Sequence, residues 1–578
     1  MVIVRAVALT LALAGMRSPA QAQTQTPEPA DLVFRGGRIY TAEDAAPVAE
    51  ALAVTGDRIT YVGSAPGLRS YIGPRTRIFE LGDWIVVPGL TDAHAHVMGI
   101  GARELRLNLE GVANIPDVQR RVGERVRQTP EGQWIVGRNW IETHWPEQRF
   151  LTRQDLDAVA PAHPVWLTRS DGHASVANTA ALTLAGVTRA TPNPFGGEIL
   201  RDSAGEPTGM LIDRAQDLVA ARIPPPDSAA LDSALIVAAA RSVRLGWTQL
   251  QDPGGEWDEV ERMRRLYRTG RLTLRIYKAM SGPGPAADSL LRRGPLLAEF
   301  GGRFTVRTIK AYLDGAVGSR GAALLAPYSD RPDTRGLLVT SLEQYRPMLR
   351  EALRRGIQVE THAIGDSANR LLLNLYEEAF TAVPPGARTV RDPRWRDEHA
   401  QVLDAMDIPR FARLGVIPSM QASHAISDLH FAPSRLGEAR LAGAYAWRSL
   451  RRTGVPIAGG SDAPVERGEP MIEFYAAVAR KDTTGFQGRG WHPEQALTRE
   501  DALKMLTRWP AYAAFEEHLR GSIAVGKWAD LTVLSADIMR IPEREILRTE
   551  AVLTVVGGEI VFTIPGPPAP ASPARGSR

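Results

Sequence analysis

In the stretch PGLTDAHAH (88–96), a turn, a short apolar strand and two histidines follow directly on one another. Pro88 and Gly89 interrupt the preceding segment, and residues 90–94 are predicted to form a strand. His94 and His96 are two positions apart, so extended backbone points both imidazoles to the same face, within reach of one cation. Two neighbouring histidines are common without a metal, so the rest of the chain decides what this pair means.

Downstream of this stretch, short apolar runs alternate with segments of helical period. Eight runs are candidate strands: 90–94, 247–252, 274–280, 304–310, 358–362, 395–399, 416–420 and 457–461. Helices are predicted between most of them, most clearly over 341–355 and 366–380. Strands alternating with helices in this way predict an α/β fold, a (β/α)8 TIM barrel over 89–515.

Three polar residues stand where later candidate strands end. His362 ends the fifth strand, His399 ends the sixth, and Asp462 follows Gly-Gly-Ser after the eighth. Active sites of such barrels lie at the carboxyl ends of the strands, and neutral imidazole is a common ligand for Zn, Mn and Fe. We therefore expect these side chains to meet His94 and His96 at one rim.

Lys310 ends the fourth candidate strand and has two interpretations. A desolvated ammonium is unfavourable, so Lys310 is expected either to pair with Asp314 or Glu360 or to be modified. An ammonium does not bind a cation, whereas an N-carboxylated lysine offers two oxygens that bridge two metals.

The two ends of the mature chain differ from the middle. Residues 30–88 and 516–565 are rich in strand patterns around turns such as Gly56-Asp57 and Gly557-Gly558, which predicts one composite β-sandwich built from both ends. Between the first two barrel strands, an insertion over about 98–241 is interpreted as a cap. The tail 566–578 is rich in Pro, Ala and Ser and is predicted to be disordered.

The composition is that of an ordinary soluble globular protein, and the N-terminus predicts that it is exported. Arg5, an apolar run over 6–15 and the small-x-small site at 20–22 predict a signal peptide over 1–22, and hence a periplasmic or secreted protein; the alternative is a cytoplasmic protein with an apolar start. No other apolar run reaches transmembrane length, so no stable membrane anchor is expected. The absence of cysteine excludes a lipoprotein anchor, disulfides and thiolate catalysis. The net charge of +4 without a basic stripe argues against nucleic acid as a partner.

Together these motifs resemble the amidohydrolase superfamily, and within it amidohydrolase family 3, the exoenzyme-regulatory and N-substituted formamide deformylase-like metal-dependent hydrolases. The matching segments are PGLTDAHAH (88–96), IKAYLDGAVGSRGAALLAPYSD (309–330), VETHAIGDSAN (359–369), DEHAQVL (397–403), SMQASHAISD (419–428), GGSDAPVE (459–466) and GSIAVGKWADLTVL (521–534). The resemblance covers essentially the whole mature chain. It implies a distorted (β/α)8 barrel with the composite β-sandwich.

The resemblance also implies a metal site with six ligands. They are His94, His96, Lys310, His362, His399 and Asp462. Two divalent ions are expected, Zn²⁺ first, with Mn²⁺ or Fe²⁺ as alternatives and Lys310 N-carboxylated; a mononuclear site is the structural alternative. In the implied mechanism a metal-activated hydroxide attacks the substrate carbonyl, and Asp462 carries a proton from it to the leaving nitrogen.

The expected reaction is hydrolysis of a non-peptide C–N bond in a small molecule, namely an amide, an N-formyl group or a cyclic amide. A deaminase or an ester or lactone hydrolase on the same metals is the first alternative, and a non-catalytic binding or regulatory protein is the second. Homo-oligomerisation is left open.

Substrate contacts are expected from several residues around the barrel mouth and in the insertion. The candidates are His173, Asp314, Ser319, Arg320, Gln421, His424, Trp140 and Trp145. Arg320 either binds a substrate carboxylate or is a solvated loop arginine. The tryptophans either form an apolar wall of the pocket or belong to a packed core.

Overall fold

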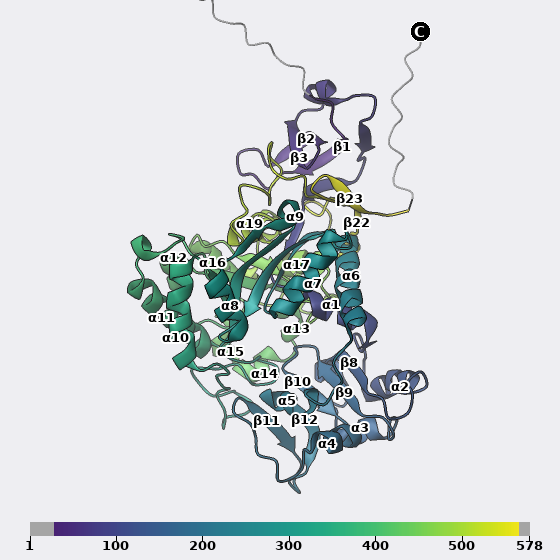
Figure 1. The fold of residues 1–578 in the computed structure, drawn as a ribbon, viewed down its shortest axis with the longest axis vertical. Coiled ribbons are helices and arrows are strands. Elements are labelled where there is room, and N and C mark those ends of the chain that lie inside the picture. The colour runs from purple at the N-terminus through teal and green to yellow at the C-terminus, as the bar shows by residue number, and fades with distance from the viewer. Residues whose placement is uncertain (1–27, 566–578) are drawn as a thin grey trace, which may run out of the picture.

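The computed structural model describes residues 28–565, so the predicted signal peptide and the predicted tail lie outside the described residues. The described strands form three sheets that follow one another along the long axis of the molecule (Figure 1). In this view the sheet built from the chain ends is at the top, the barrel is in the middle and the insertion is at the bottom.

The first sheet joins the two ends of the described chain. Its strands are β1 (Leu32–Tyr40), β2 (Val48–Thr55), β3 (Arg58–Gly63), β4 (Arg77–Glu80), β5 (Ile85–Pro88), β21 (Leu531–Leu534), β22 (Ala551–Val556) and β23 (Glu559–Thr563). They run in the order β23-β22-β21-β5-β1-β2-β3, with β4 paired to β1. The chain ends meet where β5 and β21 pair antiparallel, with Val87 opposite Thr532. Both ends thus build one sheet, while a two-layered sandwich and its domain boundaries stay predictions.

Two predicted turns of this sheet pack against each other. Gly557 and Gly558 join β22 to β23 and have φ of +56° and +77°, the left-handed region that a tight two-residue hairpin turn requires. A Cβ on Gly558 would lie 1.9 Å from the carbonyl oxygen of Gly56 in the β2–β3 turn. Glycine is therefore needed there for space as well as for conformation.

The second sheet is a nearly closed parallel barrel. Its eight parallel strands are β6 (Leu90–Asp92), β13 (Trp247–Asp252), β14 (Arg275–Ser281), β16 (Phe304–Tyr312), β17 (Gln358–Ala363), β18 (Arg396–His399), β19 (Ile417–Gln421) and β20 (Ala458–Gly460). Each predicted strand overlaps one of them, and the short β15 (Leu296–Ala298) is added antiparallel to β16. The first and last strands meet where the Ala93 amide donates to the Gly459 carbonyl at 2.9 Å. A Cβ on Gly460 would lie 2.5 Å from the His94 nitrogen, so this close approach requires glycine.

Helices cover the outside of the barrel between its strands (Figure 1). They include α6 (Ser228–Leu245), α7 (Trp257–Arg268), α8 (Pro285–Arg293), α10 (Leu342–Arg355), α11 (Asp366–Ala382), α12 (Ile408–Leu414), α16 (Trp447–Arg452) and α17 (Pro470–Ala479). The two helices predicted most clearly, α10 and α11, are confirmed within two residues at each end. In α10, Tyr345, Leu349 and Leu353 recur every four residues and are buried, and Gly356 ends the helix in the left-handed conformation.

The insertion between β6 and β13 has a sheet and a core of its own. Its strands are β7 (Leu107–Asn108), β8 (Ile135–Trp140), β9 (Val165–Arg169), β10 (Ala174–Ala177), β11 (Gly197–Arg201) and β12 (Pro207–Asp213), in the order β11-β12-β10-β9-β8-β7. Helices α1 (Val97–Leu105), α2 (Ile115–Val126), α3 (Arg153–Asp157), α4 (Thr179–Ala185) and α5 (Asp217–Ala220) complete it. Among the described residues, no helix combines the length and the apolarity that crossing a bilayer requires.

Candidate metal centre

The carboxyl ends of the barrel strands bring the six predicted ligands to one rim. Two follow β6, one each lies on β16, β17 and β18, and one follows β20: His94, His96, Lys310, His362, His399 and Asp462. All six line one cavity that opens to solvent. All except His96 are buried. Residues far apart in the sequence thus meet because parallel barrel strands end on the same side.

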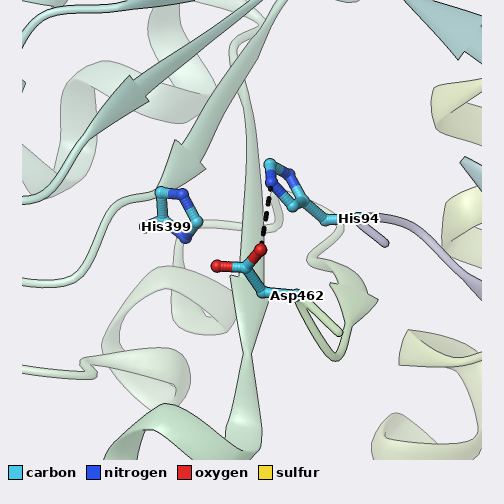
Figure 2. A group of neighbouring side chains, drawn as sticks. All are labelled: His94, His399 and Asp462. Atoms are coloured by element: carbon cyan, nitrogen blue, oxygen red, sulfur yellow. Dashed lines mark ion pairs between the residues drawn. The ribbon is translucent and has the colours of Figure 1, made fainter. Parts of the chain in front are cut away.

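His94, His399 and Asp462 form the tightest group within this cavity (Figure 2). One ligand atom from each lies within 4.8 Å of the others, and the Asp462 carboxylate lies between the two imidazoles. Asp462 Oδ1 is 3.7 Å from His94 Nε2 and 3.1 Å from His96 Nε2. Imidazole nitrogens and a carboxylate oxygen are the donor types that bind Zn²⁺.

The backbone at two of these residues is strained. His399 and Asp462 have φ of +80° and +56°, values that residues with a side chain rarely adopt. Such conformations cost free energy and are found mainly where the surrounding fold positions a functional side chain. Here they turn the last residue of β18 and the residue after Ser461 toward the cavity.

His362 and Lys310 lie beside this group and not within it. The His362 ring centroid is 4.6 Å from that of His399, and His362 Nε2 faces the Gly315 carbonyl at 3.4 Å. Lys310 Nζ lies 4.7 Å from the centre of the Tyr312 ring and has no hydrogen-bond partner among the described residues. Of the two interpretations of Lys310, pairing with Asp314 or Glu360 is not found, since neither forms a salt bridge with its Nζ.

Protonation at the site suits metal binding. Burial lowers the pKa of His94, His362 and His399 well below the usual imidazole value, and neighbouring cationic groups act in the same direction. Burial likewise lowers the pKa of Lys310, although nearby carboxylates oppose it. Metal ligands must be deprotonated, and an unpaired buried ammonium is costly. The residues present therefore fit divalent cations.

Two residues that the sequence analysis did not assign to the histidines accept hydrogen bonds from them and so orient their rings. Glu398 Oε2 accepts a short hydrogen bond from His94 Nδ1, and Gln421 Oε1 accepts one from His399 Nδ1 at 2.7 Å. Each bond fixes the tautomer and leaves Nε2 to face the cavity. The role of Glu398 could have been suspected from the sequence, because this acidic residue directly precedes His399 at a predicted strand end. Gln421 was expected to contact substrate, but it lies behind His399 and is not part of the cavity lining.

Two other expected substrate contacts are occupied elsewhere. Asp314 accepts hydrogen bonds from the amides of Ala323, Ile364 and Gly365 at 2.8–3.0 Å, so it holds the loops after β16 and β17 together. Arg320 pairs with Asp330 at 2.9 Å and does not line the cavity. Neither side chain is therefore placed to contact a substrate in this cavity: Asp314 is held by backbone amides of distant loops, and Arg320 is a loop arginine paired within its own loop.

The tryptophans also belong to a core. Trp140 is fully buried in the insertion, where its ring lies 5.9 Å from that of Trp145 and its indole donates to the Leu167 carbonyl at 3.0 Å. Neither tryptophan lines the cavity, so the expected apolar wall is wrong and the packed-core alternative holds. Ser319 is likewise buried and bonded to the Ala316 carbonyl.

His173 and His424 do line the cavity, as expected. His173 comes from the insertion and bonds Asp213 through Nδ1 at 2.7 Å; burial alone lowers its pKa, but this carboxylate raises the value to about 9. His424 Nε2 lies 3.6 Å from Asp462 Oδ2. The sequence reasoning missed the rest of the polar wall: Arg169, Ser170, Asp171, Tyr312, Gln401, Ser427, Asp428 and Glu466.

Comparisons with known proteins agree on the family of the chain. The profile of the Amidohydrolase family matches residues 77–562. YtcJ of Bacillus subtilis (strain 168) is 34% identical over 92% of this chain and 99% of its own. The N-substituted formamide deformylase of Arthrobacter pascens is 27% identical over 92% of this chain and 98% of its own. A metal-dependent hydrolase from Pyrococcus horikoshii OT3 superposes with a TM-score of 0.70 and 25% identity, covering 89% of this chain and 99% of that one.

Proposed function

This chain belongs to the amidohydrolase family, and on that basis we propose that it hydrolyses a non-peptide C–N bond in an amide, an N-formyl group or a cyclic amide. The observation that carries the proposal is the convergence of imidazoles and a carboxylate in one cavity at the barrel rim. The similarity to an N-substituted formamide deformylase supports an N-formyl amine as one substrate class.

The proposed ligands of two divalent ions, Zn²⁺ first and Mn²⁺ or Fe²⁺ as alternatives, are the six residues at the rim. They are His94, His96, Lys310, His362, His399 and Asp462. When bound, such ions lower the pKa of a water toward ~7 and polarise a substrate carbonyl. The protein contributes neutral imidazoles whose tautomers Glu398 and Gln421 fix.

Asp462 is the proposed proton shuttle. Burial alone raises the pKa of this carboxyl, but hydrogen bonding and charge from His96 outweigh it and hold the pKa below its usual value. An ionised carboxylate at neutral pH accepts a proton at one oxygen and then donates it to the leaving nitrogen, as general base and then general acid. Its second oxygen faces His424 at 3.6 Å.

N-carboxylation is proposed for Lys310. The neutral amine attacks carbon dioxide, a C–N bond forms, and one proton leaves, so the product is a carbamate anion. Burial that lowers the pKa of Lys310 favours the neutral amine that this reaction needs. Lys310 Nζ has no hydrogen-bond partner among the described residues. The carbamate formed on it would offer two charged oxygens to hold a metal ion.

Deamination and ester or lactone hydrolysis on the same site are the enzymatic alternatives, because the fold does not decide the bond cleaved. A non-catalytic regulatory role is the remaining one. We also propose a small-molecule substrate and export to the periplasm or beyond, the latter from residues 1–22 alone.

The test is metal analysis followed by an activity panel. The protein is reconstituted with Zn²⁺ and assayed on N-formyl and N-acyl amines, amino-substituted heterocycles, and esters. Asp462→Asn is expected to lower kcat about 10²-fold or more, the range for a lost general acid–base. The surface variant Glu351→Gln is the control. Full activity of Asp462→Asn refutes the proposed role of Asp462 as proton shuttle. An absence of bound divalent metal after reconstitution refutes the proposal that the protein is a metal-dependent hydrolase.

A further inference from the structure

Two basic side chains of the cavity wall, Arg169 and His173, are already matched by carboxylates, and the third, Lys310, is the residue proposed above to be N-carboxylated. Arg169 donates to Glu142 through Nε at 2.9 Å and Nη2 at 3.1 Å, and to Asp171 through Nη1 at 2.6 Å. His173 is bonded to Asp213. A substrate carboxylate would therefore have to displace one of these partners, which makes the wall unsuited to an anionic group.

Two carboxylates of the same wall lack such a match. Asp428 accepts hydrogen bonds from the Tyr445 hydroxyl and the Gln401 amide, and Glu466 accepts one from the Ser427 hydroxyl at 2.6 Å. All of these donors are neutral. Among the described residues, neither carboxylate forms an ion pair with a lysine or an arginine. Burial raises the pKa of both, that of Glu466 to about 7, and the nearby charge of His424 offsets the loss of water only in part.

A buried polar atom beside these carboxylates independently indicates a ligand. His424 is 8% exposed and lines the cavity, and its Nε2 has no hydrogen-bond partner among the described residues. A buried nitrogen without a partner is costly unless water or a ligand satisfies it. His424 neighbours both groups, since its Nε2 is 3.6 Å from Asp462 Oδ2 and its charge lowers the pKa of Asp428 and Glu466.

From this arrangement we propose that the substrate is a cationic N-acyl amine, whose amine portion carries a second, protonated amino or guanidino group bound by Asp428 and Glu466. This inference rests on the proposed function and names its substrate class. The charged group takes the place of the missing counter-ion, and the scissile amide then lies toward Asp462, with His424 between the two. Charge-assisted hydrogen bonds to buried carboxylates are about twice as strong as neutral ones, so charge governs selection.

The first test compares three matched amides at pH 8 with the zinc-reconstituted protein. N-Acetyl-1,4-diaminobutane carries an ammonium, N-pentylacetamide replaces it with a methyl group, and 5-acetamidopentanoate replaces it with a carboxylate. We expect kcat/KM for the cationic amide to exceed that for the neutral one about 30-fold, with the anionic one lowest. In Asp428→Asn and in Glu466→Gln this ratio is expected to fall to about 5-fold or less. Glu438→Gln, which removes the same charge outside the cavity, is expected to keep the ratio.

The second test measures binding without turnover. Calorimetry with the wild-type protein is expected to detect binding of n-pentylammonium and no binding of 1-pentanol. Both cavity variants, Asp428→Asn and Glu466→Gln, are expected to bind n-pentylammonium more weakly. Equal kcat/KM for the cationic and neutral amides, or an unchanged ratio in both variants, overturns the inference while leaving amide hydrolysis intact. If no amide is cleaved, the proposed function fails and binding alone decides: a preference for n-pentylammonium that both variants lose supports the inference, and equal affinities for amine and alcohol overturn it.

Discussion

Asp530 is the buried carboxylate that connects the barrel to the sheet built from the chain ends. It accepts from Arg275 at 2.7 and 2.9 Å, from Arg520 at 3.3 Å and from the Gly557 amide at 2.8 Å. The three charged side chains are at most 2% exposed. Asp530→Asn keeps one oxygen but points an amide donor at groups that are themselves donors. Removing one partner from such a buried pair costs about 3–5 kcal/mol, so we expect the free energy of unfolding to fall by that amount.

The assay is urea unfolding of the full chain followed by tryptophan fluorescence, with the surface variant Glu351→Gln as a control expected to change stability by less than about 0.5 kcal/mol. Burial alone raises the pKa of Asp530, but Arg275 and Arg520 outweigh it and hold the pKa below its usual value. Because the pKa of Asp530 is lower in the folded state than in the unfolded state (~3.9), its ionisation stabilises the folded protein at pH values above ~3.9. This contribution disappears as the pH falls through the pKa of the folded state. The difference in free energy of unfolding between wild type and Asp530→Asn is thus expected to be at its maximum at pH 7 and to shrink below about pH 4. A difference under about 1 kcal/mol at pH 7, or one that grows in acid, refutes the reasoning.

Three further outcomes follow from the site and its surroundings. Gln421→Leu removes the acceptor of His399 Nδ1, so the Zn²⁺ affinity is expected to drop about 10–100-fold in a competition titration with a chelator dye, and unchanged affinity would contradict the orienting role. Trp140→Ala is expected to lower the free energy of unfolding by about 3–5 kcal/mol in urea titrations while leaving KM unchanged, because the indole is packed in the insertion and not in the cavity. Prolonged dialysis against a chelator is expected to abolish hydrolysis, and added Zn²⁺ to restore it; activity that survives verified removal of metal would argue against the centre.

Much of the site was accessible from local patterns. Each of the eight predicted strands overlaps an observed one, and His94, His362 and His399 lie at or just after their ends. The positions of the metal-binding candidates follow from strand ends alone, because parallel barrel strands must end at one rim. The expectations that failed concern side chains whose partners are distant in the sequence, such as Trp140 with Leu167 and Asp314 with Gly365.

The sequence by itself determined that the stretch around His94 and His96 opens a barrel whose later strand ends carry the other candidate ligands, because strand period and strand order are local properties. Only the tertiary structure decided which charges in the cavity are free. Arg169 is neutralised by Glu142, whereas Asp428 and Glu466 meet only neutral donors. Charge matching depends on which side chains burial brings within a few ångströms of one another, and no local pattern specifies that.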